Sequence, residues 1–147
     1  MPVYETRFAI NASPQQVWNA VVSFDRYPEW NPQIRAIRGS CEVGAAIKLT
    51  LCLPDRPVLD VSARIEQVEP FVRLTWRGHV IAPWFFEGYR RFEIEAVGEG
   101  RVMFTHVEDV HGVVGPIFSL LMGTAQRRSH KALNGALKTR AEAHGVS

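Results

Sequence analysis

Three ionisable residues, Arg90, His106 and Glu108, stand among large apolar residues in two stretches that alternate with a period of two. In a strand, this period places every second side chain on one face. One face of the first stretch then carries Arg90, and one face of the second carries His106 with Glu108. In full, the two faces are Phe86, Gly88, Arg90, Phe92 and Ile94, and Phe104, His106, Glu108 and Val110.

A cavity lined by these two faces would hold a guanidinium, an imidazole and a carboxylate. Because a buried charge is costly unless it is paired, Glu108 is expected to meet Arg90, His106 or a ligand. Two interpretations stay open. In one, Arg90 and Glu108 form an internal ion pair that fixes strand register, and His106 completes its hydrogen bonds. In the other, the trio binds the polar end of an apolar ligand, with Arg90 as anion or carbonyl partner and the other two as hydrogen-bonding or acid–base groups.

The remaining histidines and the cysteines predict no metal site and no cofactor. His111 falls on the opposite strand face from His106, which argues against a shared ion. Cys41 and Cys52 lack CxxC spacing, and no catalytic triad motif or phosphate loop is found. The histidines that have no partner at ligand spacing and are expected to be exposed are His79, His130 and His144.

The first elements that would position these residues are a strand and two short helices. A strand is expected over Val3–Ile10. Ser13 can cap a helix over Pro14–Val22, because serine suits the cap and proline suits the first helical position. A second short helix over residues 24–27 is expected to end at the prolines that follow it. Trp30 then lies in a tight bend.

From residue 34 to residue 110 the pattern changes to period two, interrupted by breaks rich in glycine and proline. The breaks divide the stretch into six strands, with Leu49 and Leu51 on the apolar face of one of them. One apolar face and one polar face are typical of an antiparallel sheet with one buried side.

After residues 112–116, apolar residues recur at three- and four-residue steps to about residue 144. This spacing predicts one helix about 40 Å long, enough to cross the sheet. The basic cluster of Arg127, Arg128, His130 and Lys131 is expected on its solvated face. The residues expected on its buried face are Ile117, Leu120, Leu121, Ala125, Ala132, Leu133, Ala136 and Leu137.

This order of elements resembles the helix-grip fold of the START/Bet v1-like (SRPBCC) superfamily, in its polyketide cyclase/dehydrase and lipid-transport group. The segments that carry the resemblance are INASPQQVW at 10–18, FDRYPEWNP at 24–32, LTWRG at 74–78 and FTHVE at 104–108, followed by Gly112. The resemblance implies an α+β fold in one domain over residues 1–147. The chain would form a strand, two short helices, six further strands and a long C-terminal helix. Its seven strands would make a curved antiparallel sheet that surrounds this helix.

The resemblance also implies an internal pocket for a small hydrophobic molecule. Trp84 follows Pro83 in a loop-to-strand turn, so it belongs either to the pocket rim or to the core. Phe118 lies in a glycine-flanked helix start that is either a gate or a plain packed terminus. The residues expected to bind the ligand are Arg90, His106, Glu108, Phe86, Phe92, Phe104, Leu49, Leu51, Trp30, Trp84, Phe118 and Leu121.

Charge and hydropathy limit the partners. The net charge is +2, and the seventeen Lys and Arg residues are scattered among fifteen acids, so no nucleic-acid partner is expected. The longest apolar stretch is interrupted by glycine and proline and is too short to span a bilayer, so no stable membrane insertion is expected. With no leader-like start, a cytoplasmic monomer or homodimer is expected.

Three functions stay open. The favoured one is binding or transport of a lipid, aromatic, quinone-like or polyketide-like molecule. The second is a cyclase, aromatase or dehydratase in which His106, Glu108 and Arg90 transfer protons and stabilise an enolate. The third is a protein-interaction module with an incidental pocket.

Overall fold

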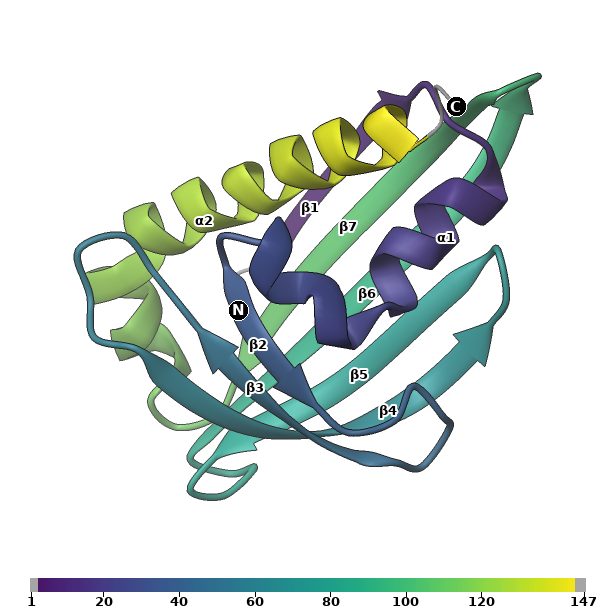
Figure 1. Ribbon diagram of the computed structural model, residues 1–147. Coiled ribbons are helices and arrows are strands. Elements are labelled where there is room, and N and C mark those ends of the chain that lie inside the picture. The colour runs from purple at the N-terminus through teal and green to yellow at the C-terminus, as the bar shows by residue number, and fades with distance from the viewer. Residues whose placement is uncertain (1–2, 145–147) are drawn as a thin grey trace.

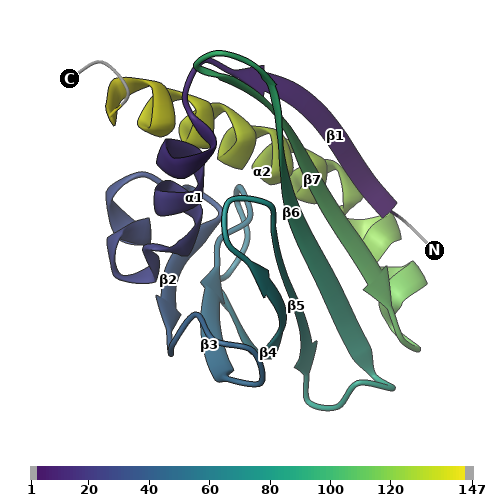
Figure 2. The same ribbon diagram turned by 90° about the vertical axis from the view of Figure 1, so that its right-hand side faces the viewer.

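The computed structural model describes residues 3–144, apart from the side chains of Ser119 and His144. Its strands form one curved antiparallel sheet in the order β1-β7-β6-β5-β4-β3-β2. A long helix lies across the concave side of this sheet, and two short helices fill the space beside it (Figures 1 and 2). The predicted α+β helix-grip architecture with seven strands is therefore confirmed.

Each predicted element is present. The bounds are β1 Val3–Ile10, α1 Pro14–Val22, η1 Phe24–Glu29, β2 Ile34–Arg38, β3 Ala46–Leu51, β4 Leu59–Glu69, β5 Arg73–Val80, β6 Phe86–Gly98, β7 Arg101–His111 and α2 Gly115–His144. The second short helix, η1, is a 3-10 helix and runs further than expected, past Pro28. Proline does not end it, because its turn hydrogen bonds are donated by the N–H groups of Arg26 and Trp30.

The cap of α1 is reciprocal. Ser13 Oγ accepts from the backbone N–H of Gln16 at 3.2 Å, and Gln16 Oε1 accepts from the backbone N–H of Ser13 at 2.8 Å. Such a capping box satisfies two N–H groups that the first turn leaves without partners. The buried face of α1 is the predicted one: Val17, Trp18 and Val21.

The two faces of the sheet differ as the period-two pattern predicted. The concave face is apolar and packs on α1, η1 and α2. The convex face carries cross-strand ion pairs, in which Arg77 meets Glu66 at 3.1 Å and Glu87 at 3.2 Å. Between β6 and β7 the register sets Arg90 opposite Glu108. The ionisable residues therefore face the interior from adjacent positions.

The C-terminal half of α2 is held in the core, but its first turns are not. Leu133 and Leu137 are fully buried, whereas Ile117, Leu120 and Leu121 are 58%, 85% and 66% exposed. The prediction that these three are buried is therefore wrong. Ala132 is also exposed and Ala136 is half-buried.

The first turns of α2 are only partly covered by the rest of the described chain. Figure 1 shows them beside the connection between β3 and β4. Arg56 in this connection donates to the carbonyl of Leu121 at 3.5 Å, but the apolar side chains of these turns stay in contact with solvent. Among the described helices, none is both long and apolar enough to cross a membrane.

Gly112 makes the tight junction between β7 and α2. Its φ is +106°, and a Cβ there would lie 2.6 Å from the carbonyl oxygen of Phe85. The two residues after it donate backbone hydrogen bonds to the carbonyls of Trp84 and Phe85, at 2.9 and 3.0 Å. The start of α2 is thus fastened to the turn before β6.

We expect Gly112→Ala to lower the free energy of unfolding by more than about 1 kcal/mol, because both the positive φ and the close carbonyl exclude a side chain. Gly98→Ala is the matched control, since its Cβ would meet nothing within 4 Å. Urea denaturation followed by tryptophan fluorescence measures both. Equal stability of the two variants would contradict the assignment of Gly112 as a fixed junction.

Candidate functional site

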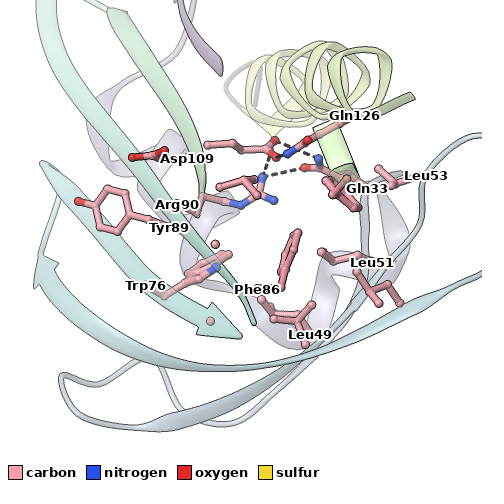
Figure 3. Close-up of a pocket in the computed structure, with 17 residues that line it drawn as sticks. Gln33, Leu49, Leu51, Leu53, Trp76, Phe86, Tyr89, Arg90, Asp109 and Gln126 are labelled. Carbon is pink, nitrogen blue, oxygen red and sulfur yellow. Dashed lines mark hydrogen bonds and ion pairs between the residues drawn. The ribbon is translucent and has the colours of Figure 1, made fainter. Parts of the chain in front are cut away.

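A cavity of about 70 Å³ lies between the concave face of the sheet and the first half of α2. Its sides are apolar, with Leu49, Leu51 and Trp76 among the residues that form them (Figure 3). Its polar groups gather at one end, where Arg90 and Gln126 lie close to Glu108. The space is therefore suited to an apolar body with one polar end.

Two glycines lie side by side in this wall of the sheet. Gly78 of β5 and Gly88 of β6 are paired directly across the strands, and both border the cavity. A Cβ on Gly88 would meet nothing within 4 Å. A Cβ on Gly78, in contrast, would lie 2.8 Å from a methyl group of Val61, so of the two glycines Gly88 alone contributes space to the cavity.

Two aromatic rings separate the cavity from an outer groove. Phe86 of β6 and Phe118 of α2 form an edge-to-face pair with ring centroids 4.9 Å apart. Both rings border the cavity, and both also border an apolar groove of about 300 Å³ near the connection between β3 and β4. With Leu53 and Leu59, which also border both spaces, these two rings form the wall between the inner cavity and the outer groove.

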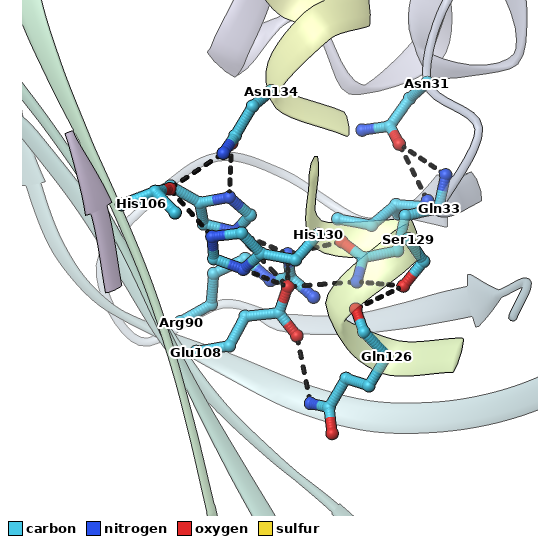
Figure 4. Close-up of polar contacts among 11 residues, drawn as sticks. Asn31, Gln33, Arg90, His106, Glu108, Gln126, Ser129, His130 and Asn134 are labelled. Carbon is cyan, nitrogen blue, oxygen red and sulfur yellow. Dashed lines mark hydrogen bonds and ion pairs between the residues drawn. The ribbon is translucent and has the colours of Figure 1, made fainter. Parts of the chain in front are cut away.

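The polar end is built on a buried ion pair. Arg90 Nη1 lies 3.2 Å from Glu108 Oε1, and the two side chains are 7% and 6% exposed. Oε1 also accepts from Gln33 Nε2 and His130 Nδ1, both at 3.0 Å, and Oε2 accepts from Gln126 Nε2 at 3.2 Å (Figure 4). Burial opposes ionisation most strongly, but the charge of Arg90 and the hydrogen bond from His130 hold the pKa of Glu108 well below its usual value.

The hydrogen bonds of His106 determine its tautomer. Arg90 Nη1 can only donate, so His106 Nε2 accepts from it at 2.9 Å. The proton then lies on Nδ1, which donates to Asn134 Oδ1 at 2.7 Å. The amide of Asn134 in turn donates to Thr6 Oγ1 at 2.7 Å. Burial, and next the positive charge of Arg90, lower the pKa of His106 well below its ordinary value, so the ring is neutral.

The same chain of hydrogen bonds continues to His130. Its Nδ1 donates to the carboxylate of Glu108, so Nε2 is free to accept from the hydroxyl of Thr6 at 2.8 Å. The rings of His106 and His130 stack with centroids 3.8 Å apart and planes 5° apart. This assignment gives each ring N–H of the two histidines an acceptor and closes a loop that links β1, β6, β7 and α2.

His106, Glu108 and His130 are also a set of metal-ligand type, since their donor atoms lie within 4.8 Å of one another. Arg90 Nη1, however, already binds both His106 Nε2 and Glu108 Oε1. A divalent ion placed among these atoms would be repelled by the guanidinium. Their arrangement as an organic hydrogen-bond network therefore accounts for them better than a metal centre does.

The structure brings half of the predicted ligand-binding residues to the cavity. Those that border it are Arg90, Glu108, Phe86, Phe118, Leu49 and Leu51. His106, Phe92 and Phe104 are buried, but they pack behind the ion pair and do not border the cavity. Their role in binding a ligand stays a prediction.

Three predicted residues lie elsewhere. Trp30 packs against Tyr27 with ring centroids 5.2 Å apart, beside a groove between α1 and α2. Trp84 lies in the turn before β6, as predicted, where it is 67% exposed and packs on Phe85. Leu121 lies on the exposed first turns of α2. None of the three borders the cavity, so their placement there is corrected.

His130 is the main correction among the histidines. It was expected on the solvated face of the last helix, but it is 2% exposed and binds Glu108. Its neighbours Arg127, Arg128 and Lys131 are exposed as predicted. The side chain of His144 lies outside the described residues.

Sequence reasoning also missed the two glutamines of the polar end. Gln33 follows a proline-rich turn and belongs to no periodic pattern, so nothing in the sequence marked it. Gln126 lies four residues before His130 and was overlooked because a polar residue interrupts the apolar stripe of α2. A stripe of alternating polar and apolar residues on one helix face is the signal that would have found both Gln126 and His130.

Comparisons with known proteins agree with this architecture. Residues 1–142 match the model of a family described as polyketide cyclase / dehydrase and lipid transport. None of the curated protein sequences compared with the chain matches it. Among solved structures, a START superfamily protein from Mycobacterium smegmatis is similar with a TM-score of 0.76 and 19% identity, over 97% of this chain and 98% of that one.

Two further structures share the fold. A hypothetical protein from Helicobacter pylori has a TM-score of 0.80 and 16% identity, over 95% of this chain and 88% of that one. An aromatase/cyclase from a Streptomyces species has a TM-score of 0.74 and 15% identity, over 96% of this chain and 93% of that one. At these identities the likeness concerns the fold alone.

The neutral, buried His106 should make the protein less stable in mild acid. Below about pH 6.5 the unfolded chain binds a proton that folded His106 does not, so the free energy of unfolding falls by up to about 1.4 kcal/mol per pH unit. Below pH 4.5, the ordinary pKa of a glutamate, the unfolded chain also binds a proton that folded Glu108 does not, because its pKa is lowered. The free energy of unfolding then falls further. Urea denaturation at pH 7, 6 and 5 measures the first effect. The variant His106→Asn should lose this slope, and an equal slope in both proteins would contradict the assignment.

Proposed function

The chain belongs to the polyketide cyclase / dehydrase and lipid transport family, and on that premise we propose that it binds a small, mostly apolar molecule in its internal cavity. The observation that carries this proposal is the separation of chemistry within the cavity: apolar walls along its sides and the Arg90–Glu108 pair at one end. Such a site orients an apolar ligand by its polar group.

The volume of the cavity indicates how a ligand enters. A cavity of about 150 Å³ is known to hold benzene, and the inner space has about half of that. A ligand with one ring therefore needs Phe86 and Phe118 to separate, so that its body extends into the outer groove. These two side chains act as the gate in our proposal.

The contacts of the polar end favour binding over proton transfer. His106, the natural proton carrier, does not border the cavity, and both its ring nitrogens already have partners. Glu108 stays ionised and accepts hydrogen bonds from four side chains, which makes it a weak base. A cyclase or dehydratase role would need at least one of these groups to reach the substrate unpaired.

A variant that fills the cavity tests the proposal. Val61 borders the cavity, so Val61→Phe should occupy the ligand space and weaken binding at least tenfold while the fold is kept. Val97→Phe is the matched control, because Val97 is exposed on β6. Native mass spectrometry detects co-purified ligand, and fluorescence of the apolar probe N-phenyl-1-naphthylamine measures affinity. A wild-type protein that retains nothing and ignores both this probe and a broad apolar library would refute the proposal.

A further inference from the structure

One polar atom at the end of the cavity has no partner. Gln126 is 5% exposed, and its Oε1 makes no hydrogen bond with any described residue. Its Nε2 donates to Glu108 Oε2 at 3.2 Å. Figure 4 shows the amide oxygen of Gln126 turned away from Glu108.

Chemistry fixes this orientation of the amide. An ionised carboxylate can only accept, so Gln126 must present its nitrogen to Glu108 and cannot exchange the two ends of its amide. The oxygen is therefore left as an acceptor in a site with apolar walls. A buried acceptor without a partner is destabilising, and a ligand that donates a hydrogen bond to it removes this cost.

Arg90 offers the complementary group. Its hydrogen bonds to described residues are all made by Nη1, to Gln33 Oε1 at 2.7 Å, to His106 and to Glu108. Its Nε and Nη2 make none with these residues, and Arg90 borders the cavity. The guanidinium thus retains donors for an acceptor on the ligand.

The acceptor and the donors are held close together, because both side chains are anchored to one carboxylate. Arg90 binds one oxygen of Glu108 and Gln126 binds the other. The pair of Arg90 and Glu108 is neutral in sum, so this pair offers no net positive charge with which to attract an anion.

Resting on the proposed function, we infer that the ligand is a neutral aromatic or enone-like molecule that carries a hydroxyl and a carbonyl a few bonds apart. The hydroxyl donates to Gln126 Oε1, and the carbonyl accepts from Arg90. The apolar part lies between Trp76 and Phe86. Gln126 is then a specificity-determining residue for the hydroxyl.

Four probes of nearly equal shape separate these contacts. The probe 3′-hydroxyacetophenone carries both groups, acetophenone the carbonyl alone and 3-ethylphenol the hydroxyl alone. The fourth probe, ethylbenzene, carries neither. In the first probe the two groups are too far apart to bond to each other. Titration calorimetry of the wild-type protein should give the tightest binding for 3′-hydroxyacetophenone, with a loss of about fivefold or more on removal of either group.

The variant Gln126→Met should remove the hydroxyl preference and keep the carbonyl preference. Gln67→Met, the same change at an exposed position of β4, should behave like the wild type. Melting temperatures confirm that each variant is folded. If Gln126→Met fails to fold, the wild-type series still decides, because it measures each group separately.

The outcomes distinguish this inference from the proposed function. Equal affinity for all four probes would overturn the inference and leave an apolar binding site. Binding of none of them while N-phenyl-1-naphthylamine binds would overturn the inference alone, whereas binding of neither the four probes nor N-phenyl-1-naphthylamine would count against the proposed function. A hydroxyl preference that survives Gln126→Met would show that another residue accepts the hydroxyl, and this would overturn the role of Gln126.

Discussion

A guanidinium and a carboxylate face each other across β6 and β7, away from water. Moving such a pair into the interior costs several kcal/mol per ion, and the cost is offset only when the remaining hydrogen-bonding positions are also filled. Glu108 meets this condition by accepting from Arg90, Gln33, Gln126 and His130. These partners come from β6, from the turn before β2 and from α2. The need to satisfy the carboxylate of Glu108 therefore determines how the sheet, the turn and the long helix pack together.

The polar interior has two sides with different tasks. On the side of the cavity, Arg90 and Gln126 retain hydrogen-bonding capacity. On the far side, His106 and His130 stack and pass hydrogen bonds through Asn134 to β1. Because the far side is complete without a ligand, it holds the near side in a fixed geometry whether the cavity is filled or not. A site that binds a defined polar group requires such an arrangement, in which a fixed hydrogen-bond network holds the contacting side chains in place.

Most of the fold could be predicted from the sequence, whereas the site could be predicted only where strands build it. A strand has a fixed period of two, so spacing alone placed Arg90 on the face of Phe92 in one strand and Glu108 on the face of His106 in the next. The period of a helix predicts which residues share one side of it. It does not predict how the helix is rotated about its axis against the sheet, nor which of its turns the sheet covers. For that reason Leu121 was expected to be buried and His130 exposed, and both expectations were wrong. Gln33 lies in an irregular turn, and only the three-dimensional structure brings it to Glu108.

Gly88 of β6 separates two properties that many binding sites couple, namely the space for the ligand body and the chemistry of the polar end. Gly88 has open space where a side chain would begin, and the polar end is built from other positions. In evolution, a methyl or isopropyl group at this one position would reshape the room for the ligand body without disturbing the charge balance at Glu108. Descendants of this chain thus have a short mutational path to ligands of different size that keep the same polar group.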